Sequence, residues 1–134
     1  MSLMTYSFTK AERICSKLTI DKLFGGGNAS MAAYPLRAVY MTNTLNESQP
    51  PISILISVPK RRFHHAVDRN RMKRLVREAY RLNKQDLSQQ MAEAGLHLDL
   101  AFVCIADTLP TSEQVTFSVH KILRRISEKY QSLT

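Results

Sequence analysis

Residues 68–84 constrain the fold of this chain more than any other segment, because they predict a helix with two unlike faces. Apolar side chains recur at the spacing i, i+3, i+4, i+7 and i+8, at Met72, Leu75, Val76, Ala79 and Tyr80. On a wheel of about 100° per residue, they lie opposite a face of arginines and lysines. Such a helix buries one side against another layer, which the rest of the chain must supply.

Three segments with strand patterns can form that layer as a β-sheet. Residues 52–58 place isoleucines on one face at period two and are followed by Pro59, which ends the strand. Residues 98–106 are a mostly apolar run that predicts a buried central strand. Residues 36–42 alternate, which predicts one face with Leu36, Ala38 and Tyr40 and another with Arg37, Val39 and Met41.

Capping residues indicate where the helices begin. A first helix is predicted within residues 8–24, capped by Ser16 or Thr19. The central helix is predicted to start at Asp68 as its N-cap and to run to about Met91.

A C-terminal helix is predicted from a capping box, in which Thr111 and Gln114 each bond the backbone of the other. The element order is then helix, strand, strand, helix, strand, helix. It predicts the α+β class, with an N-terminal, a central basic and a C-terminal helix covering a small mixed sheet in a two-layer sandwich. We expect a single domain over residues 1–134, with residues 1–3 kept out of the fold prediction because they could be a cloning scar.

The charge of the chain is concentrated in residues 60–84. Ten of the 19 Lys and Arg residues lie there against two acids, so the formal net charge of +8 is local. This field, with a pI near 9.8, favours nucleic acid as the partner over an anionic membrane surface. No apolar run reaches the length of a spanning helix, and Cys15 and Cys104 match no disulfide or zinc pattern. We therefore expect a reduced, cytoplasmic protein, with Cys104 in the core.

The cationic helix face predicts contacts with phosphate groups. Arg69, Asn70 and Arg71 are expected in the first turn, where free backbone N–H groups and the helix dipole add to the arginine charge. Like charges four residues apart, as at Lys73 and Arg77, repel one another, which favours a polyanionic partner over an ordinary solvated face. The predicted contact residues are Lys60, Arg61, Arg62, Arg69, Asn70, Arg71, Lys73, Arg74, Arg77 and Arg81.

The order of residues in this segment resembles the RNR signature of the bacterial ribonuclease P protein subunit. The resemblance rests on Lys60-Arg61 and on the run AVDRNRMKRLVRE, residues 66–78, in a strand-to-helix context. Residues 13–24 with Gly27 resemble that family's first helix and the glycine after it. The length and element order are also similar over nearly the whole chain.

The resemblance implies an RNA-binding cofactor of a catalytic RNA. That RNA, with Mg²⁺ bound mainly by the RNA itself, hydrolyses the phosphodiester that joins the 5′ leader to precursor tRNA, and the protein supplies no catalytic residue. The implied partners are the catalytic RNA and precursor tRNA. A left-handed βαβ crossover is also implied, whereas pattern alone would choose a right-handed one.

The resemblance further implies a cleft between the first helix and the sheet that holds the single-stranded leader. Phe24 matches a family aromatic near the end of the first helix, and Tyr40 matches one on the first strand, where bases can stack. Ile20 stands in place of another aromatic, which keeps apolar contact and loses the stack. Lys17 and Arg37 are candidates for phosphate contacts. Core packing is the alternative role for Phe24 and Tyr40.

Other functional classes stay open from the residues alone. A ribosomal or other structured-RNA-binding protein could use the same cationic face without an associated enzyme. A protein-only nuclease is disfavoured, because acids near the basic helix do not cluster as a two-metal site requires. His64 and His65 depart from the family pattern, and contact with RNA is favoured there over metal ligation.

Overall fold

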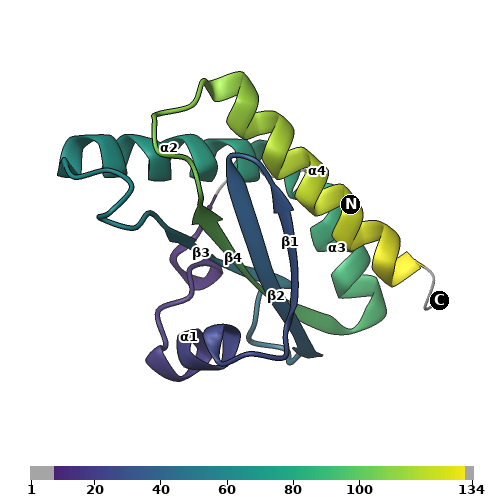
Figure 1. Ribbon diagram of the computed structural model, residues 1–134. Helices are drawn as coiled ribbons and strands as arrows, with labels where there is room; N and C mark the ends of the chain where they lie inside the picture. The colour runs from purple at the N-terminus through teal and green to yellow at the C-terminus, as the bar shows by residue number, and fades with distance from the viewer. Residues whose placement is uncertain (1–7, 132–134) are drawn as a thin grey trace.

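The computed structural model describes residues 8–131, which form one four-stranded sheet with helices on both of its faces (Figure 1). The strands are β1 (Ala29–Ala33), β2 (Leu36–Thr44), β3 (Ile52–Ser57) and β4 (Leu96–Cys104), in the spatial order β1-β2-β4-β3. β2 pairs antiparallel with β1 and with β4, whereas β3 pairs parallel with β4. The predicted α+β class with a small mixed sheet is confirmed.

The helices are α1 (Lys17–Phe24), α2 (Ala66–Asn83), α3 (Gln85–Ala94) and α4 (Ser112–Gln131), preceded by a short 3-10 helix at Lys10–Glu12. β3 and β4 are joined through α2 and α3, so the chain crosses over between parallel strands. The handedness of this crossover stays a prediction. None of the helices within residues 8–131 has the length and hydropathy to span a membrane.

The two faces of the sheet are covered by different elements. α2, α3 and α4 bury the main core against one side, which we call the helical face, where Leu36 and Leu100 are fully enclosed. We call the other side the α1 face; it carries the odd-numbered residues of β2, β3 and β4, because side chains alternate along a strand. α1 and the segment before it cover part of the α1 face through a cluster of Ile14, Leu23 and Ala101. In Figure 1, α1 and α4 lie on opposite sides of the sheet.

Two local interactions predicted from the sequence are confirmed. The Ser16 hydroxyl accepts a hydrogen bond from the Thr19 N–H at 3.4 Å and caps α1. Before α4, the Thr111 N–H donates to the Gln114 side chain at 2.9 Å, and the Gln114 N–H donates to the Thr111 hydroxyl at 3.1 Å. Both interactions join residues three positions apart, which is why a sequence pattern can indicate them.

The central helix differs from its prediction at both ends. It begins at Ala66, with His65 as N-cap, because the N–H groups of Asp68 and Arg69 both donate to the His65 carbonyl. Asp68 therefore lies inside the first turn, and its prediction as the N-cap was wrong. The predicted run to about Met91 is divided at Lys84 into α2 and α3.

A strand was missing from the prediction, and another begins earlier than expected. β1 has the sequence ASMAA, which lacks the branched and aromatic residues that indicate strands. It exists because it pairs with β2 along its whole length. β4 begins at Leu96 instead of Leu98, which adds His97 to the sheet. Cys104, at the end of β4, is buried as predicted, and burial raises the pKa of its thiol.

Candidate nucleic-acid interface

The solvent side of α2 carries a line of cations directed away from the core. The core side is fully enclosed by its neighbours at Met72 and Val76. On the solvent side, Arg71, Arg74 and Arg77 are exposed. We call the cationic face of α2 the set formed by Asn70, Arg71, Lys73, Arg74, Arg77 and Arg81, of which Lys73 and Arg81 are half-buried. The two-faced helix predicted from the sequence is thus confirmed.

The Arg69-Asn70-Arg71 motif lies further into the helix than predicted. Because α2 starts at Ala66, the Arg69 N–H already bonds the His65 carbonyl at 3.2 Å. The next N–H groups are directed to helix carbonyls four residues back. The expectation that free backbone N–H groups at these residues bind phosphate was therefore wrong. Any contact the motif makes with phosphate comes from its side chains.

The Arg69 guanidinium holds the loop that enters α2. Its Nη1 donates to the carbonyl oxygens of Phe63 and His64, each at 2.9 Å. Arg69 is half-buried, whereas Arg71, two residues on, is exposed. Arg69 therefore sets the path of residues 59–65, where Lys60 and Arg61 are exposed.

Among the cations of the loop before α2, which are Lys60, Arg61 and Arg62, only Arg62 forms an ion pair within residues 8–131. Its Nη1 lies 2.9 Å from the Asp107 carboxylate, in the segment between β4 and α4. Its Nε is enclosed, and within residues 8–131 it has no hydrogen-bond partner. The Arg62 side chain thus binds a carboxylate of the protein itself, whereas Lys60 and Arg61 are exposed to solvent.

Two further cations of the segment bind acids. Arg81 lies 2.8 Å from Glu78 on the surface of α2, and its hydrogen bond lowers the pKa of the Glu78 carboxyl. Lys84 is buried and forms an ion pair with Glu12 at 2.8 Å. Lys84 falls among the cations on the helical wheel, but the break between α2 and α3 turns it inward.

A hollow lies on the α1 face at the C-terminal end of α1, with a cavity volume of about 390 Å³. Phe24, which is 48% exposed, and Arg37 from β2 line it together with Val39 and Val103. Gly26 and Gly27 form its rim with φ of 96° and 82°, a left-handed conformation that favours glycine. The structure therefore brings Phe24 and Arg37 together, as the cleft prediction requires.

The other predicted cleft residues are not all at this hollow. Tyr40 is buried on the helical face, where the Lys129 ammonium lies 5.3 Å from its ring centroid. Its placement in a cleft with Phe24 is corrected, because alternation along β2 puts Tyr40 and Arg37 on opposite faces. Ile20 packs against the α1 face as expected of an apolar contact, and Lys17 is exposed at the start of α1.

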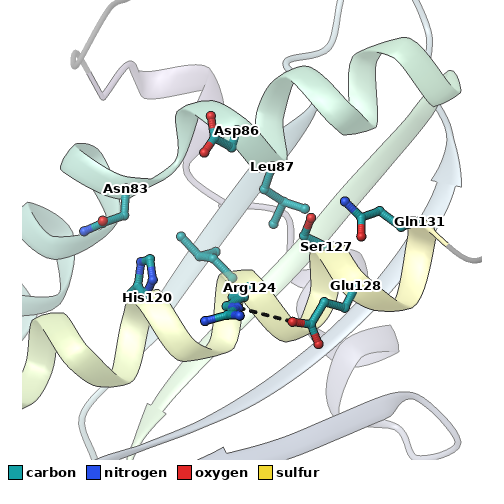
Figure 2. A pocket seen from close by; sticks show the side chains of 9 residues that line it. Asn83, Asp86, Leu87, His120, Arg124, Ser127, Glu128 and Gln131 are labelled. Atoms are coloured by element: carbon teal, nitrogen blue, oxygen red, sulfur yellow. Dashed lines mark hydrogen bonds and ion pairs between the residues drawn. The ribbon is translucent and has the colours of Figure 1, made fainter.

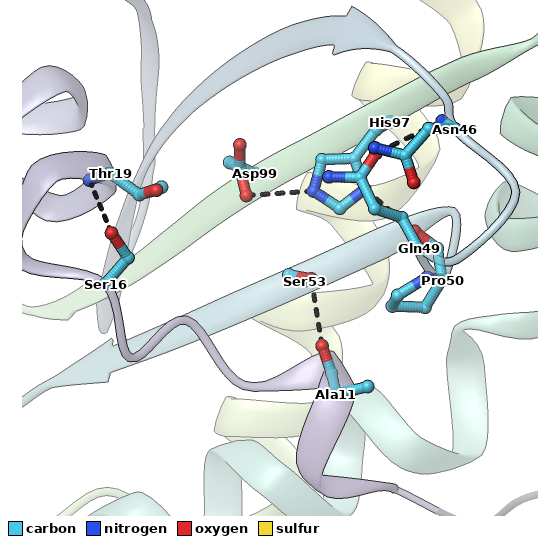
Figure 3. A network of polar contacts seen from close by, with 9 residues as sticks. All are labelled: Ala11, Ser16, Thr19, Asn46, Gln49, Pro50, Ser53, His97 and Asp99. Carbon is cyan, nitrogen blue, oxygen red and sulfur yellow. Dashed lines mark hydrogen bonds and ion pairs between the residues drawn. The ribbon is translucent and has the colours of Figure 1, made fainter.

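A second hollow on the α1 face adjoins the N-terminal end of α1 and contains a polar network (Figure 3). His97 contacts the Pro50 carbonyl through Nδ1 at 2.7 Å and the Asp99 carboxylate through Nε2 at 3.0 Å. Both side chains are buried. The bond to Asp99 raises the pKa of His97, against the opposing effect of burial. Sequence reasoning missed this pair; its signal was two polar residues at period two in an apolar strand.

Elsewhere, a hollow between α3 and α4 is lined by residues such as Asp86, His120 and Arg124 (Figure 2). Arg124 is paired with Glu128 at 3.2 Å, which reduces its charge toward a ligand. This hollow belongs to the helical layer and is separate from the α1 face. His64 and His65, before α2, are exposed.

These features define a small α+β protein with an exposed cationic helix face, and comparison with known proteins assigns it to a family. A family model described as Ribonuclease P matches residues 8–127. A ribonuclease P protein component from Porphyromonas gingivalis is 42% identical over 123 residues, covering 92% of this chain and 88% of the relative. One from Chlorobaculum tepidum is 32% identical over 130 residues, covering 91% and 84%. The chain belongs to the ribonuclease P protein family.

Solved structures show the same fold. A structure of the Staphylococcus aureus RNase P protein has a TM-score of 0.64 and 22% identity, covering 87% of this chain and 96% of that one. A second structure of the protein from that organism has a TM-score of 0.59, 23% identity and coverage of 88% and 93%.

Proposed function

We propose that this chain is the protein subunit of a ribonuclease P ribonucleoprotein and binds its catalytic RNA through the cationic face of α2. The observation that carries the proposal is the exposed line of Arg71, Arg74 and Arg77 on a helix whose other side is fixed in the core. Arginine binds phosphate in a bidentate manner. Such contacts position a folded RNA without reading its sequence.

The hollow of Phe24 and Arg37 is proposed to hold the 5′ leader of precursor tRNA. An aromatic ring accepts any base by stacking, and a neighbouring guanidinium can bind the phosphate beside it. The ring of Phe24 is half exposed and Arg37 is exposed, so both are accessible to a single strand. Tyr40 plays no part in this proposal, because it lies on the helical face.

Mg²⁺ and the hydrolytic step are assigned to the RNA. Within residues 8–131, His, Cys, Asp and Glu side chains nowhere gather in threes that could hold a metal ion. Mg²⁺ takes oxygen ligands in octahedral geometry, with phosphates among its usual partners. The donor set of the described residues does not fit that requirement. The protein binds and orients the two RNAs.

Reconstitution tests the proposal. Mixed with a bacterial ribonuclease P RNA, the protein should restore cleavage of precursor tRNA at low Mg²⁺, and the protein alone should cleave nothing. Cleavage by the protein alone would show that the chemistry belongs to the protein and that its assignment to the RNA is wrong. If the mixture cleaves precursor tRNA no better than the RNA alone, the chain is better explained as a structured-RNA-binding protein without an associated enzyme.

The salt dependence of binding tests which surface docks on the RNA. The logarithm of affinity falls with the logarithm of salt by about 0.9 for each phosphate neutralised. Arg71→Ala should therefore reduce the slope by about 1. Arg124→Ala removes the same charge from α4 and should leave the slope unchanged. Equal effects of both variants would show general attraction instead of docking on α2.

A further inference from the structure

Three hollows among the helices join into one groove, which we call the α3–α4 groove. α4 borders it on one side, and the end of α2 together with α3 borders it on the other. The hollows have cavity volumes of about 430, 460 and 610 Å³. Asn83 and His120 line both the first and the second hollow, and Asp86 and Ser127 line both the second and the third. Figure 2 shows the middle hollow, which side chains of α3 and α4 line from either side.

The shape of the groove suits a helix of another protein. It follows α4 from Glu113 to Gln131, a length of about 27 Å at the rise of an α-helix. Its middle has an apolar floor, where Leu87 and Leu123 are buried. At one end Phe117 is 68% exposed, so its ring is not covered by the core. An exposed ring beside an apolar floor is typical of grooves that receive the apolar face of an amphipathic helix.

The groove is acidic, although the formal net charge of the protein is +8. Four of the 11 acids of the chain line it, namely Asp86, Glu93, Glu113 and Glu128. Among its lining residues within 8–131, the only lysine or arginine is Arg124, which pairs with Glu128 at 3.2 Å. With His120 counted as neutral, the formal charge of the groove is −3. The groove therefore repels the phosphates of RNA and attracts cationic groups.

Two of these acids lie where their own helices disfavour them. Glu93 is in the last turn of α3, and Glu128 is in the last turn of α4. A carboxylate near the C-terminal end of a helix is unfavourable, because the helix dipole is negative there. Arg124 offsets Glu128 only in the weaker order, in which the cation precedes the acid. A cationic partner would stabilise both carboxylates.

A second copy of this chain does not match the groove. Its cationic face of α2 could satisfy the acids, but that face offers no apolar side chain to Phe117 or to the floor. RNA is excluded by charge. The remaining occupant is a polypeptide that carries both cationic and apolar side chains.

We propose that the α3–α4 groove docks an amphipathic basic helix of a partner protein. Its apolar side chains pack on Leu87, Leu123 and Phe117, and its lysines or arginines face the acids of the groove. No residue of the cationic face of α2 lines the groove, so the partner can bind while RNA occupies that face. The inference goes beyond the proposed function and does not depend on it.

Photo-crosslinking from the groove tests which molecule occupies it. Phe117→p-benzoylphenylalanine places a photoreactive ring at the exposed end of the groove in the full chain, expressed in its native cell. Irradiation and mass spectrometry should yield a cross-linked peptide of another protein, with a net positive charge and an apolar helical face. Tyr34→p-benzoylphenylalanine is the matched control, since Tyr34 is 62% exposed in the turn between β1 and β2. The control should not yield that peptide.

Reversal of one charge tests the role of the acids. Glu93→Lys places a cation where the helix dipole favours one, so the fold should be retained, which circular dichroism checks. A synthetic peptide with the cross-linked sequence should bind this variant about fivefold more weakly than the wild-type chain, because repulsion replaces attraction at a surface site. Glu47→Lys makes the same change at an exposed residue between β2 and β3 and should bind like the wild type. Fluorescence anisotropy gives the dissociation constants.

Several results would overturn the proposal. Cross-links only to RNA would show that nucleic acid occupies the groove, and cross-links only to the same chain would show self-association. A yield no higher than that of the Tyr34 control would mean that nothing docks there. A cross-linked peptide without net positive charge would contradict the proposed partner, as would a peptide that binds Glu93→Lys as tightly as the wild type.

Discussion

Arg69 and Arg71 are two residues apart on α2 and differ in what their side chains contact. Arg69 donates to the Phe63 and His64 carbonyls, and Arg71 is exposed and forms no ion pair within residues 8–131. A guanidinium that bridges two carbonyls fixes a loop, whereas a free one can pair with phosphate. The same motif therefore contains a residue that shapes the interface and one that is available to the ligand.

This difference predicts different effects on stability. Arg69→Ala should lower the free energy of unfolding by about 1–2 kcal/mol, since two charge-assisted hydrogen bonds are lost at a half-buried site. Arg71→Ala should change it by less than about 0.5 kcal/mol. Urea denaturation followed by circular dichroism measures both. Equal losses would mean that the Arg69 bonds to the loop contribute nothing.

The sequence predicts residue contacts well when the partner is close in the chain. Ser16 with Thr19 and Thr111 with Gln114 follow from spacing alone. The partners of Arg69 are backbone groups whose positions depend on the path of the loop. No residue pattern encodes that path, so the whole RNR motif was assigned to the ligand.

At the scale of elements, α1 determines which parts of the α1 face are covered and which are open. It covers the middle of that face through Leu23 and leaves a hollow at each of its ends. Asn28 stabilises the end of the helix, because its side-chain amide donates to the carbonyls of Lys22 and Leu23 at 2.6 and 3.0 Å. A short helix thus leaves two separate hollows on one face of the sheet.

Removing the ring at one end of α1 should affect substrates with a leader selectively. Phe24→Ala should weaken the binding of precursor tRNA by roughly 1–3 kcal/mol, which is the contribution of stacking one base. It should weaken the binding of mature tRNA much less. Leu18→Ala is the matched control, since Leu18 is 65% exposed on α1 and does not line the hollow. Filter binding of the reconstituted holoenzyme gives both constants. Equal weakening of the two tRNAs would indicate a folding role for Phe24.

His97, in the hollow at the N-terminal end of α1, should make the stability of the protein depend on pH. The raised pKa of His97 means that the folded protein holds the second imidazole proton more tightly than the unfolded chain does. In the unfolded chain, histidine has a pKa of about 6.5. Its contribution to stability is complete below that pH and is lost as the pH rises through the raised pKa. The urea midpoint should therefore fall with rising pH, and less so in His97→Gln. His120→Gln, at an exposed histidine, should keep the wild-type profile; an identical profile in His97→Gln would contradict the assignment.

Strand alternation was predicted correctly, and it explains an error in the predicted cleft. Arg37 and Tyr40 were placed on opposite faces of β2 by pattern and then assigned to one cleft by family position. Neighbouring residues of a strand lie on opposite faces of the sheet. Val39, and not Tyr40, therefore lines the hollow beside Phe24. β1 was missed for a different reason, because its short Ala-rich sequence becomes a strand only beside β2.

At the scale of the whole molecule, the segment before α1 connects the layers. Phe8 packs edge-on against Tyr80 of α2 with ring centroids 5.9 Å apart, and Glu12 pairs with Lys84 at 2.8 Å. The Ile14 N–H donates to the Ile54 carbonyl of β3 at 2.8 Å. These contacts join residues far apart in sequence, so composition and periodicity could not reveal them. They also explain why Lys84 is withdrawn from the cationic face.

We expect substitutions of Glu12 and Lys84 to have strongly coupled effects on the free energy of unfolding. Lys84→Met should destabilise the protein by about 3 kcal/mol, because Glu12 is left largely buried without its cation. Glu12→Gln combined with Lys84→Met should cost clearly less than the sum of the two single changes. Thermal and urea unfolding of the wild type, the two single variants and the double variant gives the coupling energy in a double-mutant cycle. Additive losses would show that the pair is not coupled.

The four-residue spacing of Lys73 and Arg77 along α2 has a consequence for the abundance of the protein. Folding brings these like charges together, which costs free energy until a polyanion neutralises them. On the proposed function, RNA at a hundredfold excess over its dissociation constant adds about 2.7 kcal/mol to stability. Copies made in excess of the RNA are then the least stable, and proteases that act on unfolded chains remove them first. Charge spacing on one helix would in this way match the supply of protein to the supply of RNA.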